Sequence, residues 1–114
     1  MVEIGESAFS ECTDLTGIDL PSSLIQVSKN AFYGCSLLKF VELPSSVTTI
    51  GDNAFYGCTL LEKIEMPSAL TSIGANAFFN CSSLKELEIP SSLKELGTLS
   101  LCKCIGLEKV VLHE

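Results

Sequence analysis

The sequence contains no arginine, and its seven lysines are outnumbered by 14 acidic residues, which gives a formal net charge of -7. Arginine is the side chain that binds phosphate groups and base edges through two parallel hydrogen bonds. Without arginine, and with this excess of acids, the chain is not expected to bind nucleic acid.

Long apolar runs are also missing. No segment approaches the roughly 18 apolar residues that a membrane-spanning helix needs. The first residues, Met1-Val2-Glu3-Ile4, have neither the basic nor the apolar region of a secretory signal. We therefore expect neither membrane insertion nor a targeting signal in this chain.

Histidine is nearly absent, since the single copy, His113, stands one residue from the end. No nucleophile, base and orienting group recur together, as a catalytic site would require. The glycines follow a regular spacing, which suits turns better than a single phosphate-binding loop. The sequence therefore predicts no enzyme activity and no cofactor.

What the sequence does contain is a repeat of 23 residues. Cysteines recur at this interval, each with an aromatic or apolar residue three places before it, at Cys12, Cys35, Cys58, Cys81 and Cys104. A period of roughly 20–50 residues is typical of solenoids. The sequence thus predicts one solenoid over 1–114, made of five repeats at 1–23, 24–46, 47–69, 70–92 and 93–114.

Each repeat contains two expected strands and a turn. The opening run of each repeat ends at an aliphatic residue that is usually followed by glycine, which indicates a brief strand. Asparagine then precedes Ala-Phe, as at Asn30, Asn53 and Asn76, where we expect it to cap a single helical turn. Phe and Cys lie three residues apart, so on such a turn both point into the core.

The end of each repeat alternates between apolar and other residues before a proline, as in Val41, Glu42, Leu43 and Pro44. Alternation of this kind predicts a strand with one buried face, and proline ends the strand because it lacks a backbone donor. Positions 17 and 19 of each repeat are therefore expected to face outward.

These features, read together as I-G-x-x-A-F-x-G-C-x-x-L-x-x-I-x-L-P-S-S, resemble the BspA-like leucine-rich repeats over the whole chain. The resemblance implies a right-handed superhelix with a short parallel sheet on its concave face, joined through the single helical turns. It also implies a secreted or cell-surface protein used in recognition or adhesion. The last repeat departs from the pattern, with Ser100-Leu101 in place of Ala-Phe and His113 in place of proline.

The six cysteines allow a disulfide, a metal site or a structural role. Equivalent residues of stacked strands lie about 5 Å apart with parallel Cβ directions, whereas a disulfide needs Cβ atoms about 3.8 Å apart. We therefore expect a ladder of buried free thiols. Cys102 lies outside this ladder, and its exposure is left open.

Charges at equivalent positions become neighbours in a solenoid. Two columns alternate in sign, one through Lys39, Glu62 and Lys85, and are expected to be structural. Another column carries acids alone in four successive repeats, beside an aromatic residue. The sequence predicts a partner-binding surface on the concave strand face at Asp19, Phe40, Glu42, Lys63, Glu65, Glu86 and Glu88.

Two functions remain open at this stage. The strand face suits a protein or peptide partner, basic if the acids take part, whereas the alternative is a passive spacer or scaffold segment of a longer repeat protein. A solvated acidic face is the plainer interpretation of the column. Tyr33, Tyr56 and Phe79 form a second possible patch, which we expect mainly to shield the turn. At the first repeat, Ile4 and Phe9 are expected to be partly exposed.

Overall fold

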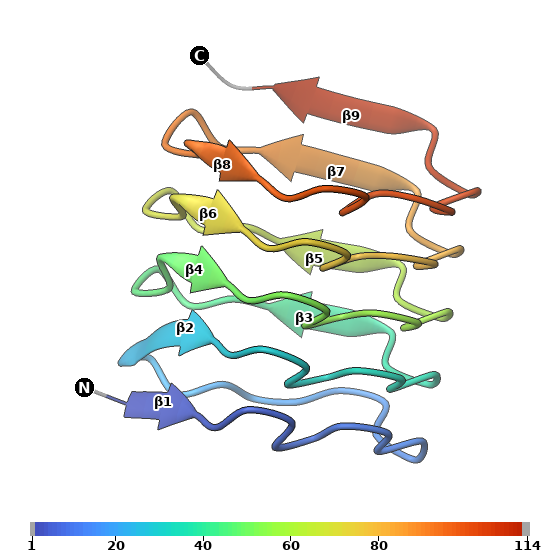
Figure 1. The fold of residues 1–114 in the computed structure, drawn as a ribbon, viewed down its shortest axis with the longest axis horizontal. Coiled ribbons are helices and arrows are strands. Elements are labelled where there is room, and N and C mark those ends of the chain that lie inside the picture. The colour runs from blue at the N-terminus through green and yellow to red at the C-terminus, as the bar shows by residue number, and fades with distance from the viewer. Residues whose placement is uncertain (1, 113–114) are drawn as a thin grey trace.

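The computed structural model describes residues 2–112, which form nine short strands joined by turns (Figure 1). In chain order the strands are β1 (Val2–Ile4), β2 (Leu24–Val27), β3 (Phe40–Glu42), β4 (Thr49–Ile50), β5 (Lys63–Glu65), β6 (Ser72–Ile73), β7 (Glu86–Ile89), β8 (Glu95–Leu96) and β9 (Lys109–Leu112). The two predicted strands per repeat are largely present. Most strands are short because a glycine or proline follows closely, as Gly51 follows β4 and Pro44 follows β3.

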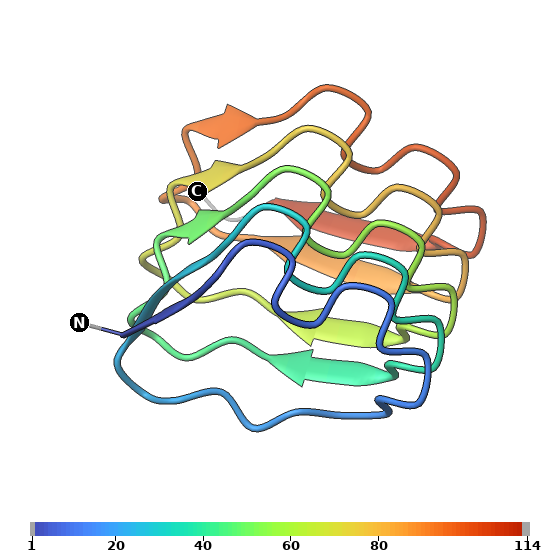
Figure 2. The same ribbon diagram turned by 60° about the horizontal axis from the view of Figure 1, so that its bottom comes forward.

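All strand pairs are parallel, and the chain winds as a parallel β-solenoid (Figures 1 and 2). The first face is a five-stranded sheet in the order β1-β2-β4-β6-β8. Its register joins residues 23 apart, as in Thr49 with Ser72 and Ser72 with Glu95. The predicted period is thus the length of one coil.

The second face carries the strands at the ends of the repeats, most of which precede a proline. Here β3 pairs with β5 and β7 pairs with β9, as two separate two-stranded sheets. We call β3, β5, β7 and β9, together with residues 17–20, the strand face. The prediction placed one parallel sheet here, but the most extensive sheet of the molecule lies on the first face.

The predicted single helical turns are wrong, because the described residues contain no helix. In the turn after β2, the N–H groups of Asn30, Phe32 and Gly34 donate to carbonyls of the next coil at 2.9, 2.8 and 2.7 Å. Only the alternate N–H groups bond locally, to the residue three before. Bonds between coils therefore replace the pattern that a helix needs.

The asparagines consequently do not cap helices. Asn30, Asn53 and Asn76 have φ values of 60°, 58° and 58°, in the left-handed region that asparagine adopts more readily than most residues. Asparagine is placed here for its backbone conformation, which turns its N–H toward the neighbouring coil.

The core runs along the solenoid axis and confirms the predicted inward positions. Phe32, Phe55 and Phe78 are fully buried, and their rings stack at centroid distances of 5.3 and 5.4 Å. Phe9 extends this stack at 5.4 Å but remains partly exposed in the first coil. Ring contacts of this kind contribute about 0.5–1.5 kcal/mol beyond the area they bury.

The cysteines form the expected ladder of free thiols, buried at Cys35, Cys58, Cys81 and Cys104. The exception is Cys12, which is only half-buried because it belongs to the first coil. The thiol of Cys58 donates to the carbonyl of Phe32 at 3.2 Å, and Cys81 bonds to Phe55 in the same way. The thiols therefore link each coil to the one before it.

Burial raises the pKa of the Cys58 thiol from 9.0 to about 12, with a smaller upward contribution from the charge of Cys35. The unfolded thiol ionises near pH 9, so between pH 9 and 12 the unfolded state holds fewer protons and stability falls as pH rises. One proton of difference corresponds to about 1.4 kcal/mol per pH unit.

We expect the free energy of unfolding to fall less steeply with rising pH in Cys58→Ala than in the wild type over this alkaline range. The comparison of slopes holds whatever the stability of the variant at neutral pH. Urea unfolding at pH 8, 9, 10 and 10.5 measures the two slopes. Parallel slopes would show that the Cys58 thiol ionises equally in the folded and unfolded states.

Candidate functional site

The strand face alternates buried and exposed side chains as predicted. In β3 the central Val41 is buried, whereas Phe40 is 57% exposed and Glu42 is exposed. The same pattern holds in β5, where Ile64 is buried between the exposed Lys63 and Glu65. The outward positions of the repeat therefore form a continuous surface along the coils.

All seven residues predicted for partner binding are exposed on this face. The structure brings four of them into direct register, because Phe40 pairs with Lys63 and Glu42 pairs with Glu65. These four side chains and Val41 line a hollow of about 190 Å³. They form one compact group around the exposed phenylalanine.

The other three lie to either side of that group. Asp19 precedes β2 in a segment without strand structure, and it lines a separate hollow of about 260 Å³ together with Glu42. Glu86 and Glu88 belong to β7, whose ladder partner is β9. The acids of the column therefore occupy equivalent positions in successive coils, but they do not belong to one sheet.

The two columns that alternate in sign do not form ion pairs along their length in the described part of the chain. Among the described residues the one ion pair joins Lys63 Nζ to Glu65 Oε1 at 3.3 Å, along a single strand. Lys39, Glu62 and Lys85 make no ion pair with one another, because exposed long side chains gain little from being fixed. Lys63 thus pairs with one acid of the column, Glu65, from the same strand.

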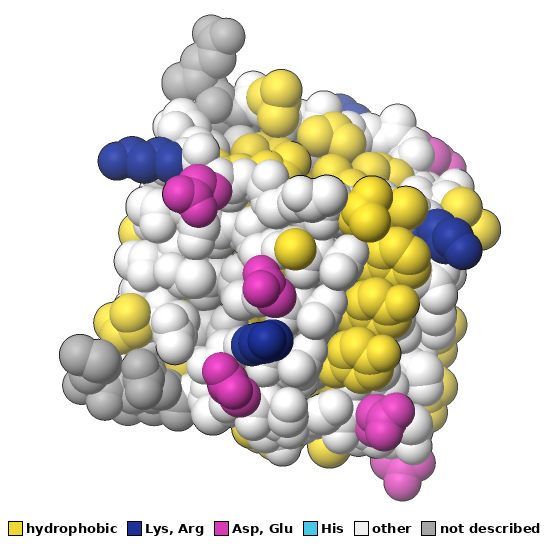
Figure 3. Space-filling model, in the orientation of Figure 1, with side chains coloured by type: hydrophobic (Ala, Val, Ile, Leu, Met, Phe, Trp, Pro, Cys, Tyr) yellow, Lys and Arg dark blue, Asp and Glu magenta, His cyan; other side chains and the backbone are white. Residues whose placement is uncertain are grey.

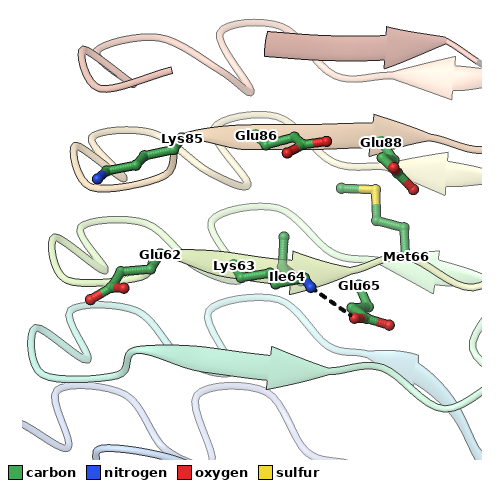
Figure 4. Close-up of a pocket in the computed structure, with 8 residues that line it drawn as sticks. All are labelled: Glu62, Lys63, Ile64, Glu65, Met66, Lys85, Glu86 and Glu88. Carbon is green, nitrogen blue, oxygen red and sulfur yellow. Dashed lines mark ion pairs between the residues drawn. The ribbon is translucent and has the colours of Figure 1, made fainter. Parts of the chain in front are cut away.

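A cleft lies between β5 and β7, which the repeat pattern does not predict. It measures about 380 Å³ and is lined by Glu62, Lys63, Ile64, Glu65, Met66, Lys85, Glu86 and Glu88 (Figure 4). A strict repeat predicts equal contacts between all coils, so the pattern could not show where the ladder is interrupted. One local difference is Met66, which stands where other coils have leucine or isoleucine.

The second predicted patch is a ring stack on the flank of the solenoid. Tyr33, Tyr56 and Phe79 stack at 4.8 Å, and the Lys103 ammonium lies 5.9 Å from the Phe79 ring centre. Each ring covers a face of its neighbour, so mainly the ring edges contact solvent. This geometry favours shielding of the turn over stacking of a planar ligand.

Hydrophobic side chains form a column along one side of the coil stack and gather at the end that holds β8 and β9 (Figure 3). At that end Leu96, Leu99 and Leu112 are 51%, 57% and 71% exposed. At the other end Ile4 and Phe9 are partly exposed, as predicted. The terminal coils lack the second neighbour that buries these positions in the central coils.

Neither a membrane span nor a metal cluster is found in the part of the chain that the structure describes. Residues 2–112 form no helix long and apolar enough to cross a bilayer. No group of three or more metal-binding side chains comes together among them.

The parallel β-solenoid with buried phenylalanine and cysteine ladders defines a leucine-rich-repeat protein. Residues 2–114 match the family model described as BspA type leucine rich repeat region (6 copies). The chain belongs to this BspA-type leucine-rich-repeat family, which confirms the resemblance seen in the sequence. The division into five repeats stays a prediction.

Solved structures of bacterial leucine-rich-repeat proteins share the fold. The T. pallidum leucine-rich-repeat protein TpLRR is 37% identical with a TM-score of 0.94, over 96% of this chain and 51% of that one. A leucine-rich-repeat protein from Bacteroides ovatus is 38% identical with a TM-score of 0.93, over 96% and 28%. A leucine-rich cell surface protein from Faecalibacterium prausnitzii is 30% identical with a TM-score of 0.91, over 96% and 29%.

The chain thus spans about half of the first of these proteins and less than a third of the other two. No curated protein matches it significantly.

Proposed function

We propose that this chain is a recognition module that binds a basic protein or peptide on the strand face, without enzyme activity. The observation that carries the proposal is the column of exposed acids, Asp19, Glu42, Glu65 and Glu88, beside the exposed Phe40. Family membership supports a role in interaction or adhesion, and the cell-surface description of the F. prausnitzii protein supports a surface or secreted location. We further propose that the strand face is the concave one.

The two parts of the site have different physical roles. Exposed carboxylates attract a basic partner over a distance of about a Debye length, roughly 8 Å at physiological salt, and so raise the association rate. Phe40 offers an apolar surface that is covered only after the partner has docked. The acids are therefore expected to act on association and the phenylalanine on dissociation.

The test uses an acetylated and amidated heptapeptide of alternating lysine and leucine, which supplies both charge and apolar contacts. Association and dissociation rates are measured at low and high salt. Glu42→Gln/Glu65→Gln should slow association and weaken its salt dependence, with little effect on folding because exposed carboxylates contribute little stability. Phe40→Ala should mainly speed dissociation.

The matched control is Glu6→Gln/Glu95→Gln, which changes the net charge equally but removes exposed acids away from the strand face. Equal effects of the two double variants would mean that net charge alone attracts the peptide. Absence of binding by the wild type would favour the alternative function, a passive spacer in a longer repeat protein.

A further inference from the structure

β5 and β7 are neighbouring strands of the strand face that are not joined in one sheet, although β3 pairs with β5 and β7 pairs with β9. On the opposite face the same two coils are paired normally, because β4 pairs with β6 through Thr49 with Ser72 and Ile50 with Ile73. The coils are therefore held together at one face and separated at the other.

The interruption begins just before the strands. In three other pairs of coils, the N–H at position 16 of the repeat donates to the carbonyl at position 16 of the preceding coil. Thus the Glu62 N–H donates to the Lys39 carbonyl at 2.8 Å, and the Glu108 N–H donates to the Lys85 carbonyl at 2.8 Å. The equivalent bond from Lys85 to Glu62 is not formed among these described residues. A main-chain carbonyl and a main-chain N–H therefore border the cleft without their usual partners.

The cleft that results has an apolar floor and an acidic rim. Ile64 and Met66 point from β5 and its end toward β7, and Met66 lies beside Glu88 (Figure 4). Four glutamates and two lysines line the cleft, which gives it an excess of two negative charges. Its volume of about 380 Å³ lies within the range of about 300–1,000 Å³ that is usual for ligand pockets.

We propose that this cleft receives one arginine or lysine side chain of the partner, with the aliphatic stem against Met66 and the charged group between Glu65 and Glu88. The inference rests on the proposed function and adds the side chain that the partner must present. An aliphatic stem with a cationic end matches a pocket that is apolar below and acidic above.

The chain itself shows that this rim binds an ammonium group. Lys63 Nζ lies 3.3 Å from Glu65 Oε1, although both side chains remain more than half exposed. An exposed pair of this kind contributes only about 0.2–1 kcal/mol, so an incoming cation displaces it at low cost. Lys63 is therefore a competitor for the partner's basic side chain, and its removal should strengthen binding.

Met66 provides a direct probe, because the sequence contains only two methionines and Met1 supplies the other methyl signal. The protein labelled with ¹³C at the methionine methyl groups is titrated with an acetylated, amidated Gly-Gly-Arg-Gly-Gly peptide. The control peptide has citrulline, which has nearly the same shape but no charge, in place of arginine. We expect a saturable shift of the Met66 methyl signal with the arginine peptide and none with the citrulline peptide.

Lys63→Gln should tighten binding of the arginine peptide roughly two- to fivefold, because Glu65 loses its internal partner. Lys109→Gln removes the same charge at the equivalent position of β9, outside the cleft, and should have a smaller effect. An unchanged Met66 signal, an equal response to citrulline, or equal effects of the two lysine variants would overturn the inference. If the lysine–leucine heptapeptide still binds the strand face in that case, the proposed function stands without the cleft.

Discussion

Phe55→Ala is expected to lower the free energy of unfolding by about 3–5 kcal/mol, the usual cost of truncating a fully buried aromatic residue. The Phe55 ring is fully buried and stacks on Phe32 at 5.3 Å and on Phe78 at 5.4 Å. Its removal leaves a cavity between two coils that the hydrogen bonds on either side prevent from closing. Urea denaturation of the variant and the wild type measures the loss.

Two variants in the same ring system serve as controls. Phe9→Ala should cost clearly less, because Phe9 is partly exposed and stacks on one neighbour only. Tyr56→Ala should also cost less, because Tyr56 remains partly exposed on the flank. Equal losses for Phe55 and Tyr56 would mean that both rings contribute alike and that the core is wrongly assigned.

Gly74→Ala is the second substitution with a large expected effect. A Cβ atom at Gly74 would lie 2.5 Å from the Asp52 backbone nitrogen and 2.7 Å from the Gly51 carbonyl carbon, both in the preceding coil. These are main-chain atoms, so the coils themselves would have to separate. We expect a loss of about 1–3 kcal/mol or more, as for other forced overpacking.

The chain contains its own control at the equivalent position of the first coil. A Cβ atom at Gly5 would have no atom within 4 Å, so Gly5→Ala should be neutral or slightly stabilising. Thermal unfolding of the two alanine variants compares them directly. A similar loss at both positions would show that glycine is needed for its own conformation and not for the spacing between coils.

Much of the fold was predictable because a repeat turns local spacing into long-range contacts. The 23-residue period became the register of the strands, and the inward Phe and Cys positions became the ring and thiol ladders. The outward positions of the strand face followed from simple alternation, as Phe40 and Glu42 show around the buried Val41. Each of these features depends on side-chain identity, which the sequence displays directly.

The turns were not predictable in the same way. Asn-Ala-Phe matches the start of a helix when only local hydrogen bonds are considered. In the structure, however, the N–H groups of Asn30 and Phe32 donate hydrogen bonds to carbonyls of the next coil. The left-handed conformation of Asn30 makes this possible. A local pattern does not reveal this choice, because the acceptors belong to residues more than 20 positions away.

The candidate site was predictable in its membership but not in its geometry. Exposure of Asp19, Phe40 and Glu88 follows from the repeat. The pairing of Lys63 with Glu65 and the cleft beside Met66 depend on rotamers and on small differences in coil spacing. Those differences involve a few hydrogen bonds, which a repeat pattern treats as identical in every coil.

The central claim is that the strand face binds a basic partner, and chemical-shift mapping tests it most directly. The ¹⁵N-labelled protein is titrated with the lysine–leucine heptapeptide, and the amide shifts are assigned to residues. The account predicts that the largest shifts occur at Phe40, Glu42, Lys63 and Glu65. Shifts centred instead on the Tyr33 and Tyr56 flank, or on the exposed end at β8 and β9, would contradict it.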